Sequence, residues 1–271
     1  EQSAVLFIAA SETESNLYYA TRFIAPDPFI YLEVKGERLM VMSDLEVDRA
    51  RNQATVDRVL SYSELERRAK SQGVKDPGTI DVIHLVLQDA GLKDILVPPT
   101  FPFLHASRLQ EMGYRLRTKR DPFYEQRVMK SDDEVRHIEA AQRATETAVA
   151  AAHQHLRRAE SRDNVLWLDG EILTSERVKK LINVALMECD CVAQHTIVAG
   201  GEQACDPHDE GSGPLPAHRS IIFDVFPRSA ETRYFADMSR TVVRGTPSPE
   251  LTRLYHAVKD AQEEAITKIR D

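Results

Sequence analysis

The chain of 271 residues has little cysteine, no long apolar run and no excess of basic residues. Three cysteines are too few, and odd in number, for a disulfide framework, so the chain fits a reducing cytoplasm. No apolar run approaches the roughly 20 residues that span a bilayer as a helix, and the first residues lack a basic signal-peptide start. A formal net charge of -8 argues against a protein that binds duplex nucleic acid, whose binding face is normally basic. We therefore expect a cytoplasmic protein with neither a membrane nor a nucleic acid as its partner.

Two of the cysteines, Cys189 and Cys191, form a C-x-C pattern. That spacing suits a metal, but no second Cys or His pair accompanies it. We interpret these residues, and Cys205, as ordinary core thiols, because free cysteine is among the most buried residue types.

Strand and helix signals alternate through the first 120 residues. Apolar runs predict strands at 5–9, 29–34, 38–42, 94–97 and 114–117. A capping box at 63–66 and glycine-terminated segments at 81–89 and 104–111 predict helices. This alternation is typical of a layered α/β domain.

The pattern changes after Asp121, and a second capping box begins at Ser131. Apolar residues at intervals of three and four predict a long helix that reaches His155 or Leu156. Another helix opens at Thr174, strands follow at 195–199, 220–226 and 233–243, and a last helix begins with Ser248 and Pro249. We place the domain boundary near residues 120–130 and divide the chain into 1–125 and 126–271.

The most informative residues are two aspartates inside predicted apolar strands, Asp224 and Asp237. A carboxylate in such a position is costly unless it is paired, protonated or bound to a cation. A short polar turn, 229–232, would let the two strands form a hairpin in which the carboxylates face each other. Hard divalent cations favour such ligands. The alternative is that each aspartate lies on the solvent face of its strand.

Two histidines lie between these strands and the preceding helix. His208 follows Pro207 in a loop rich in Gly and Pro, where it is a proton shuttle, an electrophilic partner or only a surface residue. His195 opens a predicted strand and is interpreted as a core or edge histidine.

The segment from His195 through Pro207-His208, then Asp224, then Asp237-Met238-Ser239-Arg240-Thr241, resembles the metallopeptidases of the "pita-bread" fold. The closest group is the Xaa-Pro peptidases of the prolidase and aminopeptidase P type. The resemblance implies an α+β fold, with a small α/β creatinase-like N-terminal domain followed by a pita-bread catalytic domain.

The resemblance also implies roles for individual residues. Asp224 and Asp237 match the first two metal ligands, His208 matches the histidine that stabilises the reacting carbonyl, and Ser239 and Arg240 match supports of the ligands. Two divalent ions, Mn, Co or Zn, are the implied cofactors. The implied reaction is hydrolysis of the bond before proline in a proline-containing peptide, carried out by a homodimer.

Three departures from the family pattern stand out. Phe226 replaces a usual glycine, and the separation of the two aspartates is two residues longer than the commonest one. The even insertion keeps both side chains on one face. The family's remaining ligands, a His and two Glu, have no counterpart after Asp237. We therefore expect a C-terminally incomplete catalytic domain that is inactive by itself.

Two other functions stay open. A catalytically dead pita-bread protein that only binds partners would explain the absent ligands. A creatinase-like, metal-free amidinohydrolase would lack the aspartates, so Asp224 and Asp237 count against it.

Overall fold

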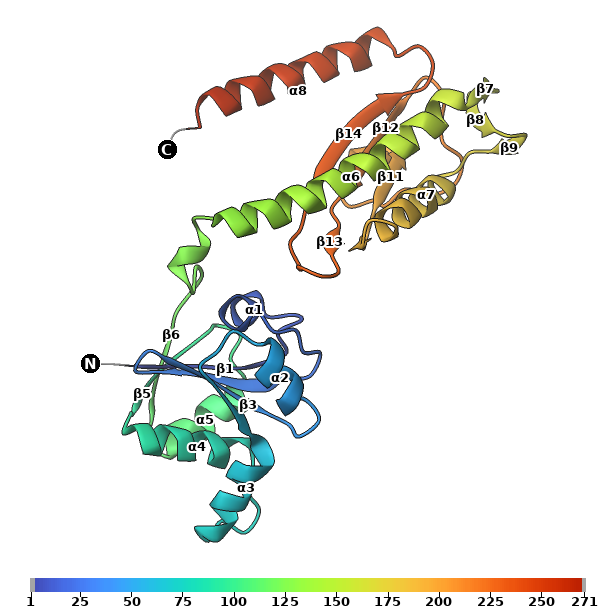
Figure 1. The fold of residues 1–271 in the computed structure, drawn as a ribbon. Helices are drawn as coiled ribbons and strands as arrows, with labels where there is room; N and C mark the ends of the chain where they lie inside the picture. Colours follow the sequence, from blue (N-terminus) through green and yellow to red (C-terminus); the bar gives the residue numbers. More distant parts are fainter. Residues whose placement is uncertain (1–2, 270–271) are drawn as a thin grey trace. The chain divides into compact units, whose positions relative to one another are not determined.

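The structure, a computed structural model, describes residues 3–269. The chain divides into two compact units between Met129 and Lys130, four residues beyond the boundary expected from the sequence. Both units mix helices with sheets, which is the α+β class expected from the sequence (Figure 1). No helix within residues 3–269 is long and apolar enough to cross a membrane.

The N-terminal unit is built on a six-stranded sheet with the strand order β4-β3-β2-β1-β5-β6. β1 pairs antiparallel with β2 and parallel with β5, so the sheet is mixed. The predicted strands at 29–34 and 38–42 are observed as β2 and β3, which pair with each other in antiparallel fashion. The strands are β1 (Ala4–Ala9), β2 (Phe29–Val34), β3 (Glu37–Met42), β4 (Arg58–Ser61), β5 (Asp94–Val97) and β6 (Arg115–Thr118).

Helices cover both faces of this sheet because its strands alternate two sets of apolar side chains. Leu6 and Leu32 face one cluster with α4, whereas Phe7 and Tyr31 face another with α1 and α2. The sequence predicted α3, α4 and α5 but not α1 and α2. The helices are α1 (Ser15–Thr21), α2 (Val47–Gln53), α3 (Tyr62–Ser71), α4 (Thr79–Ala90), α5 (Phe103–Glu111) and the 3₁₀ turn η1 (Glu125–Arg127).

Because both faces of its sheet are covered by its own helices, we predict that the segment 1–129 folds without metal. Its thermal unfolding, followed by circular dichroism, should be the same with and without a chelator. Unfolding that shifts to lower temperature on chelation would contradict this, because metal binding would then contribute to its folding free energy.

The C-terminal unit begins with a long helix, α6 (Asp132–Arg158), capped as the sequence predicts. The Ser131 hydroxyl accepts from the Glu134 backbone N–H at 3.3 Å, and the Glu134 carboxylate accepts from the Ser131 N–H at 2.9 Å. Thr174 likewise caps α7 (Ser175–Met187).

A small meander that the sequence did not predict lies between the helices. It consists of β7 (Glu160–Arg162), β8 (Val165–Leu168) and β9 (Glu171–Ile172).

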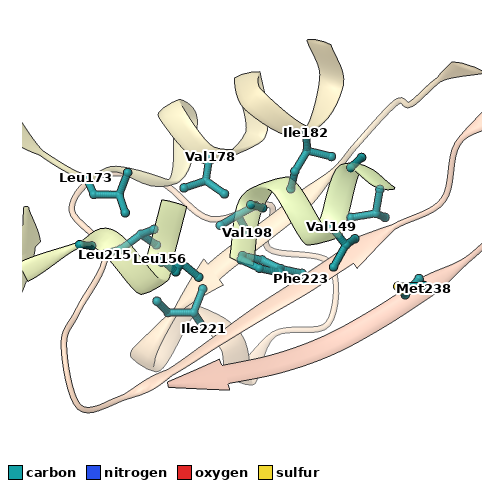
Figure 2. Close-up of a cluster of buried hydrophobic side chains, with 14 of the residues drawn as sticks. Val149, Leu156, Leu173, Val178, Ile182, Val198, Leu215, Ile221, Phe223 and Met238 are labelled. Carbon is teal, nitrogen blue, oxygen red and sulfur yellow. The ribbon is translucent and has the colours of Figure 1, made fainter. Parts of the chain in front are cut away.

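Helices α6 and α7 pack on one face of the antiparallel sheet β11-β12-β14. Figure 2 shows Phe223 and Ile221 of β12 among side chains of both helices. The strands are β11 (Ile197–Gly200), β12 (Ser220–Val225) and β14 (Met238–Val243). The last helix, α8 (Pro249–Thr267), begins at the predicted Ser248 cap, and none of its residues is buried.

The connection between β12 and β14 differs from the expected short hairpin. After β12 the chain forms β13 (Arg228–Ser229), which pairs with β10 (Cys191–Val192) rather than with a neighbour in the main sheet. β14 starts at Met238, so Asp237 precedes the strand instead of lying inside it. β12 and β14 nevertheless pair directly.

Candidate metal centre

Asp224 lies on the face of β12 that is turned away from the helices. Its neighbours Phe223 and Val225 are fully buried in the core beneath α6 and α7. Since side chains alternate along a strand, Asp224 must point to the opposite face. It is half-buried there.

Asp237 lies on the same face as Asp224. Ser239 is the residue directly opposite Asp224 in the β12–β14 register, and Asp237 stands two positions before Ser239. This even offset makes Asp237 the diagonal neighbour of Asp224. Although Asp237 is exposed overall, partial burial, the negative charge of Asp224 and a hydrogen bond with Asp224 raise its pKa. The structure therefore brings the two carboxylates together.

Ser239 holds the carboxylate of Asp224 in place. Its hydroxyl donates a hydrogen bond to Asp224 Oδ1 at 2.6 Å. Arg240 follows Ser239 but pairs with Phe223 in the register, on the helix-covered side of the sheet. Its Nη1 donates to the Ser239 carbonyl oxygen at 2.8 Å. Ser239 thus contacts an aspartate directly, whereas Arg240 acts on the backbone of β14.

His208 lies in the exposed loop after the 3₁₀ turn η2 (Gly201–Cys205). Its backbone N–H donates to Asp206 Oδ1 at 3.0 Å. Within residues 3–269, its ring takes part in no hydrogen bond or ion pair, including with either aspartate. The structure therefore brings Asp224, Asp237 and Ser239 together and leaves His208 apart from them.

The sequence predicted that His195 opens a strand. In the structure His195 lies two residues before β11, with a positive φ of 58°. Its Nδ1 lies 2.7 Å from Glu210 Oε1. Cys191 is buried as predicted, but Cys189 and Cys205 are exposed, so the prediction of core thiols is wrong for those two.

His153 of α6 is a residue near this sheet that sequence reasoning missed. Its ring lies 5.6 Å from the Phe223 ring, and its Nε2 is buried without a hydrogen-bond partner. Burial, followed by the charges of Arg157 and Arg240, lowers the pKa of His153, so the ring is neutral on the helix side of the sheet. The one feature of the sequence that could have pointed to His153 is its position among the apolar residues of the predicted long helix.

Two neighbouring carboxylates, of which Asp237 has a raised pKa, fit a hard divalent cation, because a cation would relieve their mutual repulsion as a bound proton does. They are not a full ligand set. Within residues 3–269, no group of three or more His, Cys, Asp or Glu side chains is close enough to hold a metal ion. The structure thus provides two candidate ligands at this position.

Comparison with known proteins gives the following matches. The model of Metallopeptidase family M24 matches residues 136–271. An uncharacterized peptidase from Staphylococcus saprophyticus is 24% identical over 95% of this chain and 68% of its own length. A Xaa-Pro dipeptidase from Pyrococcus horikoshii is 24% identical over 65% of this chain and 47% of its own. The solved structure of a Xaa-Pro dipeptidase from Bacillus anthracis superposes with a TM-score of 0.79 at 16% identity, covering 99% of this chain and 68% of that one.

Proposed function

The chain belongs to metallopeptidase family M24, and on that premise we propose that it forms part of a hydrolase that cleaves the peptide bond before proline. One structural observation carries the proposal: Asp224 and Asp237 share one face of the β12–β14 pair, with Ser239 bonded to Asp224. The specificity for proline is supported by the names of the similar proteins from Pyrococcus horikoshii and Bacillus anthracis.

In this proposal Asp224 and Asp237 would hold two divalent cations, Mn, Co or Zn. When bound, these ions would supply the Lewis acidity that polarises the scissile carbonyl and activates water. Ser239 fixes the orientation of the Asp224 carboxylate through its 2.6 Å hydrogen bond. Arg240 keeps the backbone of Ser239 in position.

His208 would donate a hydrogen bond to the oxygen of the reacting carbonyl as negative charge develops there. Its ring is exposed and forms no hydrogen bond within the described part of the chain, so it can turn toward a substrate. We assign the N-terminal unit as the creatinase-like domain and extend the proposal to a homodimer, both on the family resemblance.

A second candidate, a binding protein of the same fold without activity, is favoured by one observation. The described residues bring together two ligands, whereas catalytic sites usually have three or more from the protein. A single experiment separates the two functions.

The experiment compares the purified 271-residue chain with the gene product that carries it. Each is mixed with Mn and a Xaa-Pro dipeptide, with the matching Xaa-Ala dipeptide as the control substrate, and metal binding is titrated by calorimetry. We expect the gene product to cleave the proline dipeptide and a chelator to abolish cleavage. The 271-residue chain should be inactive and bind Mn more weakly than about 1 μM, because two carboxylates alone form a poor site.

Two results would contradict these expectations. A gene product that binds metal but cleaves neither dipeptide would support the inactive binding protein. Turnover by the 271-residue chain with tight Mn binding would mean that further residues of this chain, such as His208 or His195, complete the site.

A further inference from the structure

The register that pairs β12 with β14 continues beyond the ends of the two strands. The Ala236 N–H donates a hydrogen bond to the Pro227 carbonyl oxygen at 3.0 Å. One position farther along, Arg228 forms an antiparallel bridge with Phe235. Both pairs keep the spacing of the pairs within the strands. Side chains just beyond the strand ends therefore follow the same alternation between the two faces of the sheet.

Two aromatic residues share the face of the two aspartates. Phe226 lies two positions after Asp224 and stands opposite Asp237, whereas Phe235 lies two positions before Asp237. Even offsets along a strand keep side chains on one face. The residues that alternate with them are buried: Val225, Pro227, Ala236 and Met238.

Both rings keep exposed surface within residues 3–269. Phe235 is 60% exposed, and Phe226 is half-buried. The guanidinium carbon of Arg228 lies 5.9 Å from the centre of the Phe235 ring, and this cation–π contact restrains the ring beside the aspartates. Aromatic rings contribute large contact areas when they are covered by a ligand. The face that carries the candidate metal ligands thus also carries an apolar surface.

We propose that Phe226 and Phe235 form the subsite for the side chain of the residue before proline, and that this subsite selects large apolar side chains. The assignment rests on the proposed function, which brings the scissile carbonyl to Asp224 and Asp237. That carbonyl belongs to the residue before proline, so the side chain of this residue begins two bonds from the reacting carbon. Each ring lies two positions along the sheet from an aspartate, roughly 7 Å, which a side chain of leucine's size can span.

The test compares kcat/KM of the Mn-loaded gene product on Gly-Pro, Leu-Pro and Glu-Pro. We expect Leu-Pro to exceed Gly-Pro at least about tenfold, because covering a leucine side chain is favourable enough to supply that ratio. Phe235→Ala and Phe226→Ala should each lower the ratio at least about threefold, chiefly by raising KM for Leu-Pro. Phe235→Lys should raise kcat/KM for Glu-Pro relative to Leu-Pro, because it places a cation in the subsite.

Two further measurements separate the subsite from metal binding and from cleavage. Mn affinity by calorimetry should be the same for Phe235→Ala and the parent, since the ring is not a metal ligand. Analogues of Leu-Pro and Gly-Pro in which a methylene replaces the scissile carbonyl cannot be cleaved, and the leucine analogue should bind more tightly. Phe103→Ala, at an 85% exposed position on α5, is the matched control and should change neither the analogue preference nor the ratio.

Three results would overturn the proposal. In the first, the parent cleaves Leu-Pro no better than Gly-Pro. In the second, Phe235→Ala and Phe226→Ala lower kcat/KM equally for all three dipeptides, so the rings only support the fold. In the third, the two analogues bind equally. Cleavage of none of the dipeptides would instead contradict the proposed function. The analogue titration then decides the subsite by itself, because a preference for the leucine analogue that Phe235→Ala removes would still support it.

Discussion

Replacing either aspartate of the candidate metal centre with alanine should lower Xaa-Pro hydrolysis by the gene product more than a hundredfold. The reason is that Asp224 on β12 and Asp237 immediately before β14 are neighbours on the same face of the sheet, so each would ligate the same pair of ions. Loss of a group that only supports a ligand typically costs about 10–100-fold in metal affinity or activity, and loss of a ligand itself costs more. Ser239→Ala, which removes the hydrogen bond to Asp224, should accordingly fall within about 10–100-fold.

The measurement is kcat/KM on a proline dipeptide together with Mn affinity by calorimetry. Asp260→Asn, at an exposed position on α8, is the matched control and should leave both values unchanged. Because the aspartates act as a unit, the double variant should lose little more than either single one. Full activity of Asp237→Asn, or losses that multiply in the double variant, would show that the two carboxylates do not serve one site.

The shared face of the two aspartates followed from sequence because it depends on local rules. Strand alternation places Asp224 away from the core, and an even offset from Ser239 places Asp237 on the same face. The path between them did not follow from sequence, because it depends on contacts far along the chain. The pairing of Ser229 with Cys191 draws the connection away from a simple hairpin.

Short elements were the ones that sequence reasoning missed. α1 has seven residues and is too short for a helical apolar pattern, and its cap is an unusual one, in which the Glu14 side chain accepts from the Asn16 N–H. A cavity of the N-terminal unit that Tyr31 and Tyr124 help to line was equally hidden. Nothing in the apolar run of β2 shows that Tyr31 meets Tyr124, which approaches from the far end of the same unit.

Truncating Phe223 to alanine should destabilise the C-terminal unit by about 3–5 kcal/mol, the usual cost of emptying a buried aromatic site. Phe223 is 0% exposed and packs between α6 and the centre of the sheet (Figure 2). Total stabilities are about 5–15 kcal/mol, so this loss is a large fraction. Because Asp224 is the next residue on β12, a displaced strand should also weaken Mn binding by the gene product.

Urea unfolding followed by tryptophan fluorescence measures this change in the correct unit, because the chain's one tryptophan, Trp167, lies in β8. Phe235→Ala is the control, since Phe235 is 60% exposed and contacts Arg228 at the ring face. It should cost less than about 1 kcal/mol. If both substitutions lower the free energy of unfolding by similar amounts, Phe223 is not tightly packed between the helices and β12. The inference that this packing turns Asp224 toward the opposite face would then also be wrong.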